Sequence, residues 1–178
     1  LSLFFRGNLQ GARQLLIPLE KELENVRAYL ALEQTRFPNK YQVDFEIENG
    51  IEKVLIPPFL LQPLVENAIH YAFPHRKQTG KISIQVYSKD GYMKMIVADN
   101  GQGIEEDRLH ILSKQIVHST GGNGMAIFNI SERLKGIYNN QAHFKIESKS
   151  GEGTTVKILI PLVSKGGDEQ DAASLCSG

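Results

Sequence analysis

The chain has 178 residues and equal numbers of acidic and basic side chains, 20 of each, so its net charge does not favour nucleic acid or an anionic membrane as a partner. A chain of this length can bury a substantial core, and its single cysteine, Cys176, excludes an intramolecular disulfide and a cysteine-rich metal site. The most apolar run, 54–65, contains three prolines and is too short to span a bilayer.

Residues 1–38 have the pattern of a helical stem. Between 19 and 36 apolar residues recur at helical spacing: Leu19, Leu23, Val26 and Leu30. This spacing predicts an amphipathic helix that ends before Pro38, with charged residues such as Glu22 at its other positions. The stem is expected either to form a dimerisation hairpin with a preceding helix in 1–16 or to pack on the domain that follows. Because the chain begins at Leu1 within an apolar helical stretch, we expect it to be a fragment of a longer protein.

Residues 39–163 are predicted to form one α+β domain. Alternation of apolar and polar residues predicts five strands, over 42–48, 81–88, 93–99, 142–148 and 154–161. Helical spacing predicts helices over 61–72 and 125–138. The turn Lys89-Asp90-Gly91 is typical of a hairpin, so the sheet is expected to be mostly antiparallel, with helices on one face. Residues 164–178 have the composition of a disordered tail.

The segment Asp99-Asn100-Gly101-Gln102-Gly103, here called the Asp99 loop, follows directly on an apolar strand. A strand end would hold the carboxylate of Asp99 rigidly, while the glycines let the backbone turn sharply. The same residues also make ordinary turns. Taken with the rest of the chain, the loop is interpreted as a strand that ends at a ligand.

Two further glycine-bearing loops could present backbone amides to the same ligand. Gly121-Gly122-Asn123-Gly124-Met125-Ala126 leads into a predicted helix, where free N–H groups and the helix dipole favour an anion such as phosphate. It is not a P-loop, because no Gly-Lys-Ser/Thr follows, and it could instead be a flexible loop before a helix. The third loop spans 151–155. The long polar connection over 104–123 is typical of a functional or mobile segment.

The predicted helix over 61–72 carries polar side chains next to its apolar face: Gln62, Glu66, Asn67 and His70. The side-chain oxygen of Asn67 could bind Mg²⁺, which typically takes few protein ligands and keeps water and substrate phosphates. The same side chain could instead cap or bridge a neighbouring loop.

Four segments, in order and spacing, resemble the N, G1, G2 and last glycine boxes of the GHKL ATP-binding fold. They are Leu61 to Ile69, Asp99-x-Gly101-x-Gly103, Gly122-x-Gly124-x-Ala126 with Asn129 and Arg133-Leu134, and Gly151-x-Gly153-Thr154. The N box, together with Leu19 to Leu23 and Arg36-Phe37, is also similar to LytS-like sensor histidine kinases of two-component systems. The resemblance implies a two-layer α/β sandwich of the GHKL (Bergerat) type over 39–163, preceded by part of the dimerisation and phosphotransfer helices.

The resemblance also implies roles for individual residues. Asp99 would accept a hydrogen bond from the adenine amino group, Asn67 would coordinate Mg²⁺, and Glu66 would orient or polarise the reacting group. Residues 104–123 would form a lid over the nucleotide. The other residues implied to contact ATP are His70, Gly101, Gly103, Ile104, Gly122, Gly124, Met125, Ala126 and Thr154.

The implied partners are ATP, Mg²⁺ and a response regulator, with a homodimer in the full-length protein and no nucleic acid. Contact with a membrane would come only through regions outside this chain. The chain itself would be a cytoplasmic domain of a membrane-anchored bacterial sensor. In the family the phosphate acceptor is a histidine in an Asn-Pro-His-Phe type motif upstream, and the chain contains no such motif. We therefore expect it to bind ATP without phosphorylating itself by the family's route.

Two departures from the family pattern leave alternatives open. Ala126 stands where the G2 box usually has glycine, which would suit a degenerate nucleotide-binding or interaction module of the same fold. Pro63 stands where many GHKL proteins have a candidate base, which places more weight on Glu66. An ATP-driven clamp or a serine kinase would share the fold, but the predicted stem helix before the first strand argues against a clamp.

Overall fold

The computed structural model describes residues 16–73, 79–110 and 125–162, without the side chains of 125–128. Several predicted features lie outside these residues. They are almost all of the preceding helix, the disordered tail, most of the predicted lid, and Gly122 and Gly124 of the G2 box.

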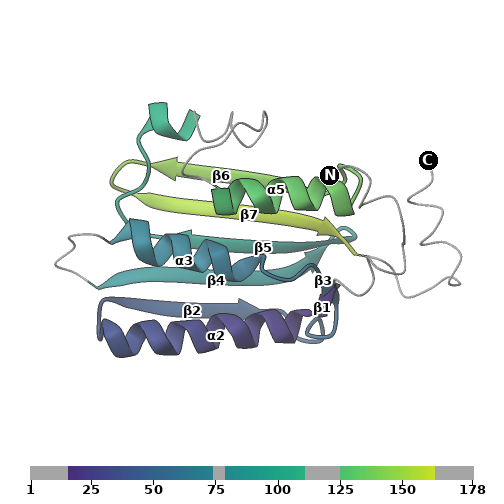
Figure 1. Ribbon diagram of the computed structural model, residues 1–178, viewed down its shortest axis with the longest axis horizontal. Helices are drawn as coiled ribbons and strands as arrows, with labels where there is room; N and C mark the ends of the chain where they lie inside the picture. Colours follow the sequence, from purple (N-terminus) through teal and green to yellow (C-terminus); the bar gives the residue numbers. More distant parts are fainter. Residues whose placement is uncertain (1–15, 74–78, 111–124, 163–178) are drawn as a thin grey trace, which may run out of the picture.

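A five-stranded sheet forms one layer of the domain (Figure 1). Its strands, in spatial order, are β2 (Tyr41–Ile47), β4 (Gly80–Lys89), β5 (Tyr92–Asp99), β7 (Gly153–Pro161) and β6 (His143–Lys149). The β2–β4 pair is parallel and the other three pairs are antiparallel. The prediction of five strands in a mostly antiparallel sheet is confirmed.

Three helices cover one face of this sheet: α2 (Leu19–Arg36), α3 (Leu61–Ala72) and α5 (Met125–Ile137). In β4, β5 and β7 every second side chain is buried against them, which places the core between the two layers. The expected two-layer α/β sandwich with helices on one face is therefore confirmed. None of the helices in the described part of the chain is long and apolar enough to cross a membrane.

A short two-stranded sheet at one end of the layers was not predicted. It pairs β1 (Ile17–Pro18) with β3 (Leu55–Ile56), and two residues are too few to show an alternating pattern. Just after β1, the amides of Leu19 and Glu20 donate to the carbonyls of Val54 and Glu52 at 2.9 and 2.8 Å. These bonds satisfy N–H groups that the first turn of α2 leaves without partners.

Helix α2 packs on the same core as the rest of the domain. Its Leu19, Leu23, Val26 and Leu30 are buried in the core cluster that also contains the apolar face of α3. The structure thus shows the second of the two arrangements expected for this helix, while a dimerisation hairpin stays a prediction. Two acids on α2, Glu22 and Glu33, are buried instead of facing solvent.

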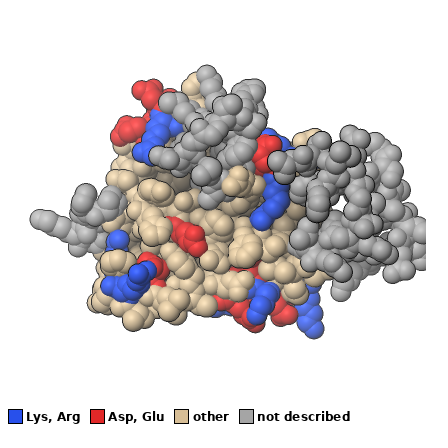
Figure 2. Space-filling view, in the orientation of Figure 1, with Lys and Arg blue, Asp and Glu red and all other residues tan. Residues whose placement is uncertain are grey.

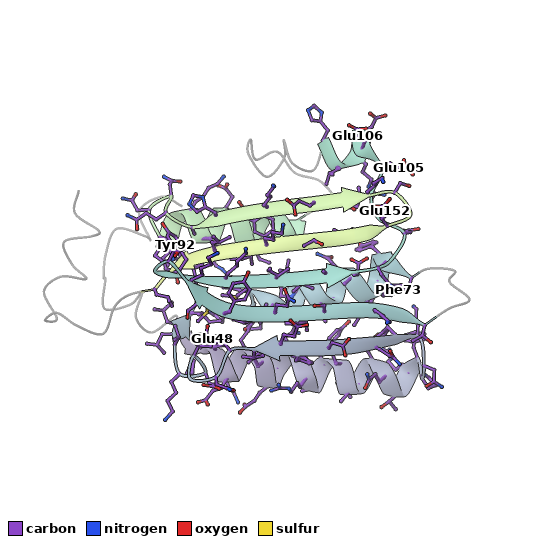
Figure 3. The ribbon with its side chains drawn as sticks, turned by 180° about the vertical axis from the view of Figure 1, so that it is seen from behind. Glu48, Phe73, Tyr92, Glu105, Glu106 and Glu152 are labelled. Carbon is purple, nitrogen blue, oxygen red and sulfur yellow. The ribbon has the colours of Figure 1, made fainter. Side chains whose placement is uncertain are left out.

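No helix among the described residues covers the other face of the sheet, which carries polar side chains (Figure 3). Glu147 forms ion pairs with Lys145 and Lys157 there, and Gln85 donates to Glu46 across the parallel pair at 2.7 Å. On the helix face, acidic and basic side chains lie interspersed among the described residues (Figure 2). Neither the acidic nor the basic side chains form an extended patch on the part of this face that is described.

Candidate functional site

Asp99 lies at the end of β5, next to the start of β7. Its Oδ1 accepts hydrogen bonds from the amides of Gly101, at 2.8 Å, and Thr154, at 3.3 Å. Asp99 and Thr154 are also paired residues in the β5–β7 ladder. The half-buried carboxylate is therefore fixed in direction, with Thr154 beside it.

The C-terminal end of α3 holds the Asp99 loop from one side. Gln102 donates its backbone N–H to the carbonyl of Ala72 at 2.9 Å and its side-chain Nε2 to that of Tyr71 at 2.7 Å. These carbonyls belong to the last turn of the helix, which has no intrahelical donor for them. The loop and the helix that carries Asn67 are thus joined directly.

The β6–β7 hairpin holds the loop from the other side. Gly151 donates to the carbonyl of Gln102 at 2.7 Å, and Ile104 donates to the hydroxyl of Ser148 at 2.9 Å. Ser148 Oγ also lies 2.8 Å from both the carbonyl of Gly153 and the hydroxyl of Thr154. Sequence reasoning missed Ser148, because a lone serine at the end of a strand carries no motif.

Three glycines of the predicted boxes are required by close contacts with neighbouring segments. A Cβ at Gly101 would lie 2.3 Å from the Cβ of Ala72, on α3. Gly153 has a φ of +109°, and a Cβ there would lie 2.0 Å from the carbonyl oxygen of Asp99. Gly103 lies against the carbonyl of Lys149. These contacts draw the Asp99 loop, α3 and the hairpin together.

Gly101→Ala is expected to lower the free energy of unfolding by about 1–3 kcal/mol, because the added methyl must push α3 away from the loop. Urea denaturation followed by circular dichroism measures this change. The matched control is Gly136→Ala on the exposed side of α5, where a Cβ would meet nothing within 4 Å. The control should be neutral or stabilising, since alanine is the better helix former. Equal stability of Gly101→Ala and wild type would contradict the close packing of the Asp99 loop against α3.

The predicted polar residues of α3 lie on different sides of that helix. Glu66 accepts a hydrogen bond from Gln62 Nε2 at 2.9 Å. Burial raises the pKa of Tyr29, on α2, to about 12, and the charges of Glu33 and Glu66 add to this shift. Glu66 therefore lies on the α2 side of α3. Asn67 is half-buried and lies about 100° further round the helix.

Asn67 is the candidate metal ligand, and none of the described residues forms a hydrogen bond with its side chain. Among the described residues, no group of three or more His, Cys, Asp or Glu side chains could hold a metal ion by itself. A single amide oxygen fits Mg²⁺ that takes its remaining ligands from water and from nucleotide phosphates. The donor set does not fit a metal held entirely by protein.

The structure thus brings Asp99, Gly101, Gly103, Ile104 and Thr154 together at one end of the sheet, against the end of α3. Figure 3 shows Phe73, Glu105 and Glu152 at the same end, and Tyr92 and Glu48 at the opposite end.

The remaining predicted residues are only partly placed by the structure. His70 is exposed in the last turn of α3. Met125 and Ala126 begin α5, as predicted, but their side chains are not described.

Two families match the chain. Residues 58–164 match the family described as histidine kinase-, DNA gyrase B-, and HSP90-like ATPase, and residues 1–41 match the family described as histidine kinase. The first match contains all four predicted boxes.

Curated relatives share about half of the aligned residues with this chain. The sensor protein LytS of Bacillus cereus is 50% identical over 177 residues, which are 99% of this chain and 30% of the relative. The sensor histidine kinase/phosphatase LytS of Staphylococcus aureus is 46% identical over 162 residues, 90% of this chain and 28% of the relative. The chain thus spans less than a third of the length of these relatives.

Solved structures share the fold at low identity. The histidine kinase domain of a blue-light activated histidine kinase from Erythrobacter litoralis matches with a TM-score of 0.60 and 22% identity, covering 90% of this chain and 65% of the other. The catalytic domain of histidine kinase ThkA matches with a TM-score of 0.58 and 17% identity, covering 83% of this chain and 94% of the other. From its sequence match and its fold, the chain belongs to the histidine kinase-, DNA gyrase B- and HSP90-like ATPase family.

Proposed function

We propose that this chain is the ATP-binding catalytic module of a LytS-type sensor histidine kinase. In this proposal the γ-phosphate of ATP passes to a histidine outside the chain, for relay to a response regulator. The observation that carries the proposal is the carboxylate of Asp99, which the amides of Gly101 and Thr154 fix at the end of β5. The relatives named sensor protein LytS support the kinase over an interaction module of the same fold.

The Asp99 end of the sheet would hold the adenine. A carboxylate accepts the hydrogen bond of the exocyclic amino group, and a bond to a charged acceptor contributes about 1.5–3 kcal/mol. Thr154 lies beside Asp99 in the ladder and would contact the same ring edge. The amides at the start of α5 would face the phosphates, where the helix dipole favours negative charge.

Asn67 would hold Mg²⁺ through its side-chain oxygen, together with the phosphates. Mg²⁺, when bound, would neutralise the charge of the phosphate oxygens. Phosphoryl transfer needs mainly position and charge neutralisation, so a site with few reactive side chains is chemically sufficient.

Glu66 would orient the accepting histidine. Its carboxylate is held by Gln62 on the α2 side of α3. The acceptor is expected on a helix that precedes α2, so this is the side from which we expect it to approach.

The wider context of the module is proposed from its relatives. The stem would take part in a homodimer of the full-length protein, and the module would lie in the cytoplasm below a membrane anchor outside this chain. Both proposals rest on the kinase assignment and on the family match of residues 1–41.

The chain by itself is expected to bind ATP but to form no stable phosphohistidine, because it lacks the acceptor motif. Incubation with γ-labelled ATP, followed by acid and base treatment of the product, measures acid-labile and base-stable label. A longer version of the protein that includes the upstream histidine is the positive control. Acid-labile, base-stable label on the isolated chain would contradict this division of roles.

A further inference from the structure

A buried carboxylate from α2 occupies the N-terminus of α3. Glu22 is 0% exposed. Its Oε1 accepts hydrogen bonds from the amides of Leu60 at 2.8 Å, Leu61 at 2.9 Å and Gln62 at 3.3 Å, and its Oε2 accepts one from Phe59 at 2.8 Å. One side chain on α2 thus binds four consecutive backbone N–H groups at the start of another helix.

These bonds complete the hydrogen bonding of the first turn of α3. The N-cap residue of this helix is Leu60, which makes no side-chain capping bond. A helix start leaves its first N–H groups without intrahelical partners. Glu22 accepts hydrogen bonds from the first three of these N–H groups, those of Leu60, Leu61 and Gln62. Pro63, the next residue, has no N–H to satisfy. The position of α3 along its axis is therefore set by a residue of α2.

Phe59, just before α3, is held by both of its backbone groups. It has a φ of +57°, a conformation that residues with a side chain rarely adopt, and the residue is 54% exposed. Its N–H donates to Glu22, and its carbonyl accepts a hydrogen bond from Arg133 at 3.0 Å. Such a conformation persists when surrounding contacts impose it, and here the contacts come from α2 and α5.

Arg133 brings α5 into the same cluster. Burial lowers the pKa of its guanidinium, and the negative charge of Glu22 offsets part of that shift. The cluster of Glu22, Phe59 and Arg133 therefore joins all three helices. It lies beside β1 and β3, at the end of the layers opposite to the Asp99 loop (Figure 1).

We propose that Glu22 is a positioning residue for the metal-dependent part of the nucleotide site. By fixing the start of α3, it sets where Asn67 lies relative to the first turn of α5, whose amides would face the phosphates. The inference rests on the function proposed above. It also makes the stem helix part of the catalytic module.

Asp99 should depend less on Glu22 than Asn67 does. The Asp99 carboxylate is held by the β5–β7 ladder and its loop by Ser148, in addition to α3. Among the described residues, the side chain of Asn67 has no hydrogen-bond partner, so its position follows that of α3. A shift of α3 should therefore weaken the Mg²⁺-dependent part of ATP binding and spare the part that depends on recognition of adenine by Asp99.

The test is Glu22→Gln in this chain, with ATP affinity measured by calorimetry in Mg²⁺ and in EDTA. The glutamine keeps the size of the side chain but turns an amide donor toward backbone donors. The gain in ATP affinity produced by Mg²⁺ is expected to fall about tenfold, since small displacements of positioned groups have large effects. The affinity in EDTA is expected to stay unchanged. The control is Glu20→Gln, an exposed acid in the same turn of α2, which should leave both affinities unchanged.

A thermal melt of each variant separates positioning from stability. A lower melting temperature with unchanged affinities at a temperature where the variant is folded would overturn the inference, as would an equal loss in Mg²⁺ and in EDTA. If Glu22→Gln does not fold, Glu22→Asp decides, because it keeps the carboxylate but shortens the side chain, so that it cannot reach all four amides from the same backbone position. Glu22→Asp should reduce the Mg²⁺-dependent gain, and an unchanged gain would overturn the inference. A wild-type chain that binds no ATP would instead overturn the proposed function, and the inference with it.

Discussion

Asp99→Asn is expected to weaken ATP binding by about ten- to a hundredfold, since a hydrogen bond to a charged acceptor contributes about 1.5–3 kcal/mol. The variant removes the charge and can turn an amide donor toward the amino group of adenine. Its carbonyl oxygen can still accept from the amides of Gly101 and Thr154, which bind Oδ1 in the wild type. The fold should therefore survive. Titration calorimetry with ATP measures the loss.

The control for this variant is Asp90→Asn, in the turn between β4 and β5. Asp90 is exposed and has a φ of +52°, which asparagine tolerates. The Asp90→Asn variant makes the same chemical change at the other end of β5, so its ATP affinity and melting temperature should equal those of wild type. If a folded Asp99→Asn variant binds ATP as tightly as wild type, the Asp99 loop is an ordinary turn.

Asn67→Ala is expected to abolish the gain in ATP affinity that Mg²⁺ provides. In a longer kinase that contains the acceptor histidine, it should lower the rate of phosphoryl transfer about a hundredfold or more. Mutating even a residue that only supports a metal ligand typically lowers metal affinity or activity by about 10–100-fold. The half-buried amide supports no other described side chain, so the loss should not come from unfolding. Transfer is measured as labelled phosphohistidine in single-turnover experiments.

Glu66→Gln is the matched comparison on the neighbouring residue. It keeps the volume of the side chain and a partner for Gln62. If Glu66 orients the acceptor, this variant should bind ATP with Mg²⁺ like wild type and transfer phosphate more slowly. An Asn67→Ala variant that keeps the full Mg²⁺-dependent gain would show that the metal is held elsewhere.

Local patterns in the sequence predicted most of the fold. The alternation in β4, β5 and β7 and the helical spacing in α2 and α3 match the buried faces that the structure shows. Such patterns report burial on one element at a time. The β1–β3 pair was missed because its strands are too short to show a period.

Contacts between distant segments could not be predicted in this way. Glu22 occupies a position on an amphipathic helix where an acid is normally solvated, and its partners lie 37–40 residues further along the chain. The bonds of Ser148 to the Asp99 loop are of the same kind. The glycine-bearing loops suggested that the segments of Asp99 and Thr154 could face one ligand, but the placing of Thr154 beside Asp99 was anticipated only through the family resemblance, since the two residues are 55 positions apart.

The most direct test of the central claim is titration of this chain with a fluorescent ATP analogue, with and without Mg²⁺. We predict saturable binding that ATP displaces and that Mg²⁺ strengthens. Absence of binding at millimolar nucleotide would contradict the assignment of the Asp99 loop and Asn67 to an ATP site.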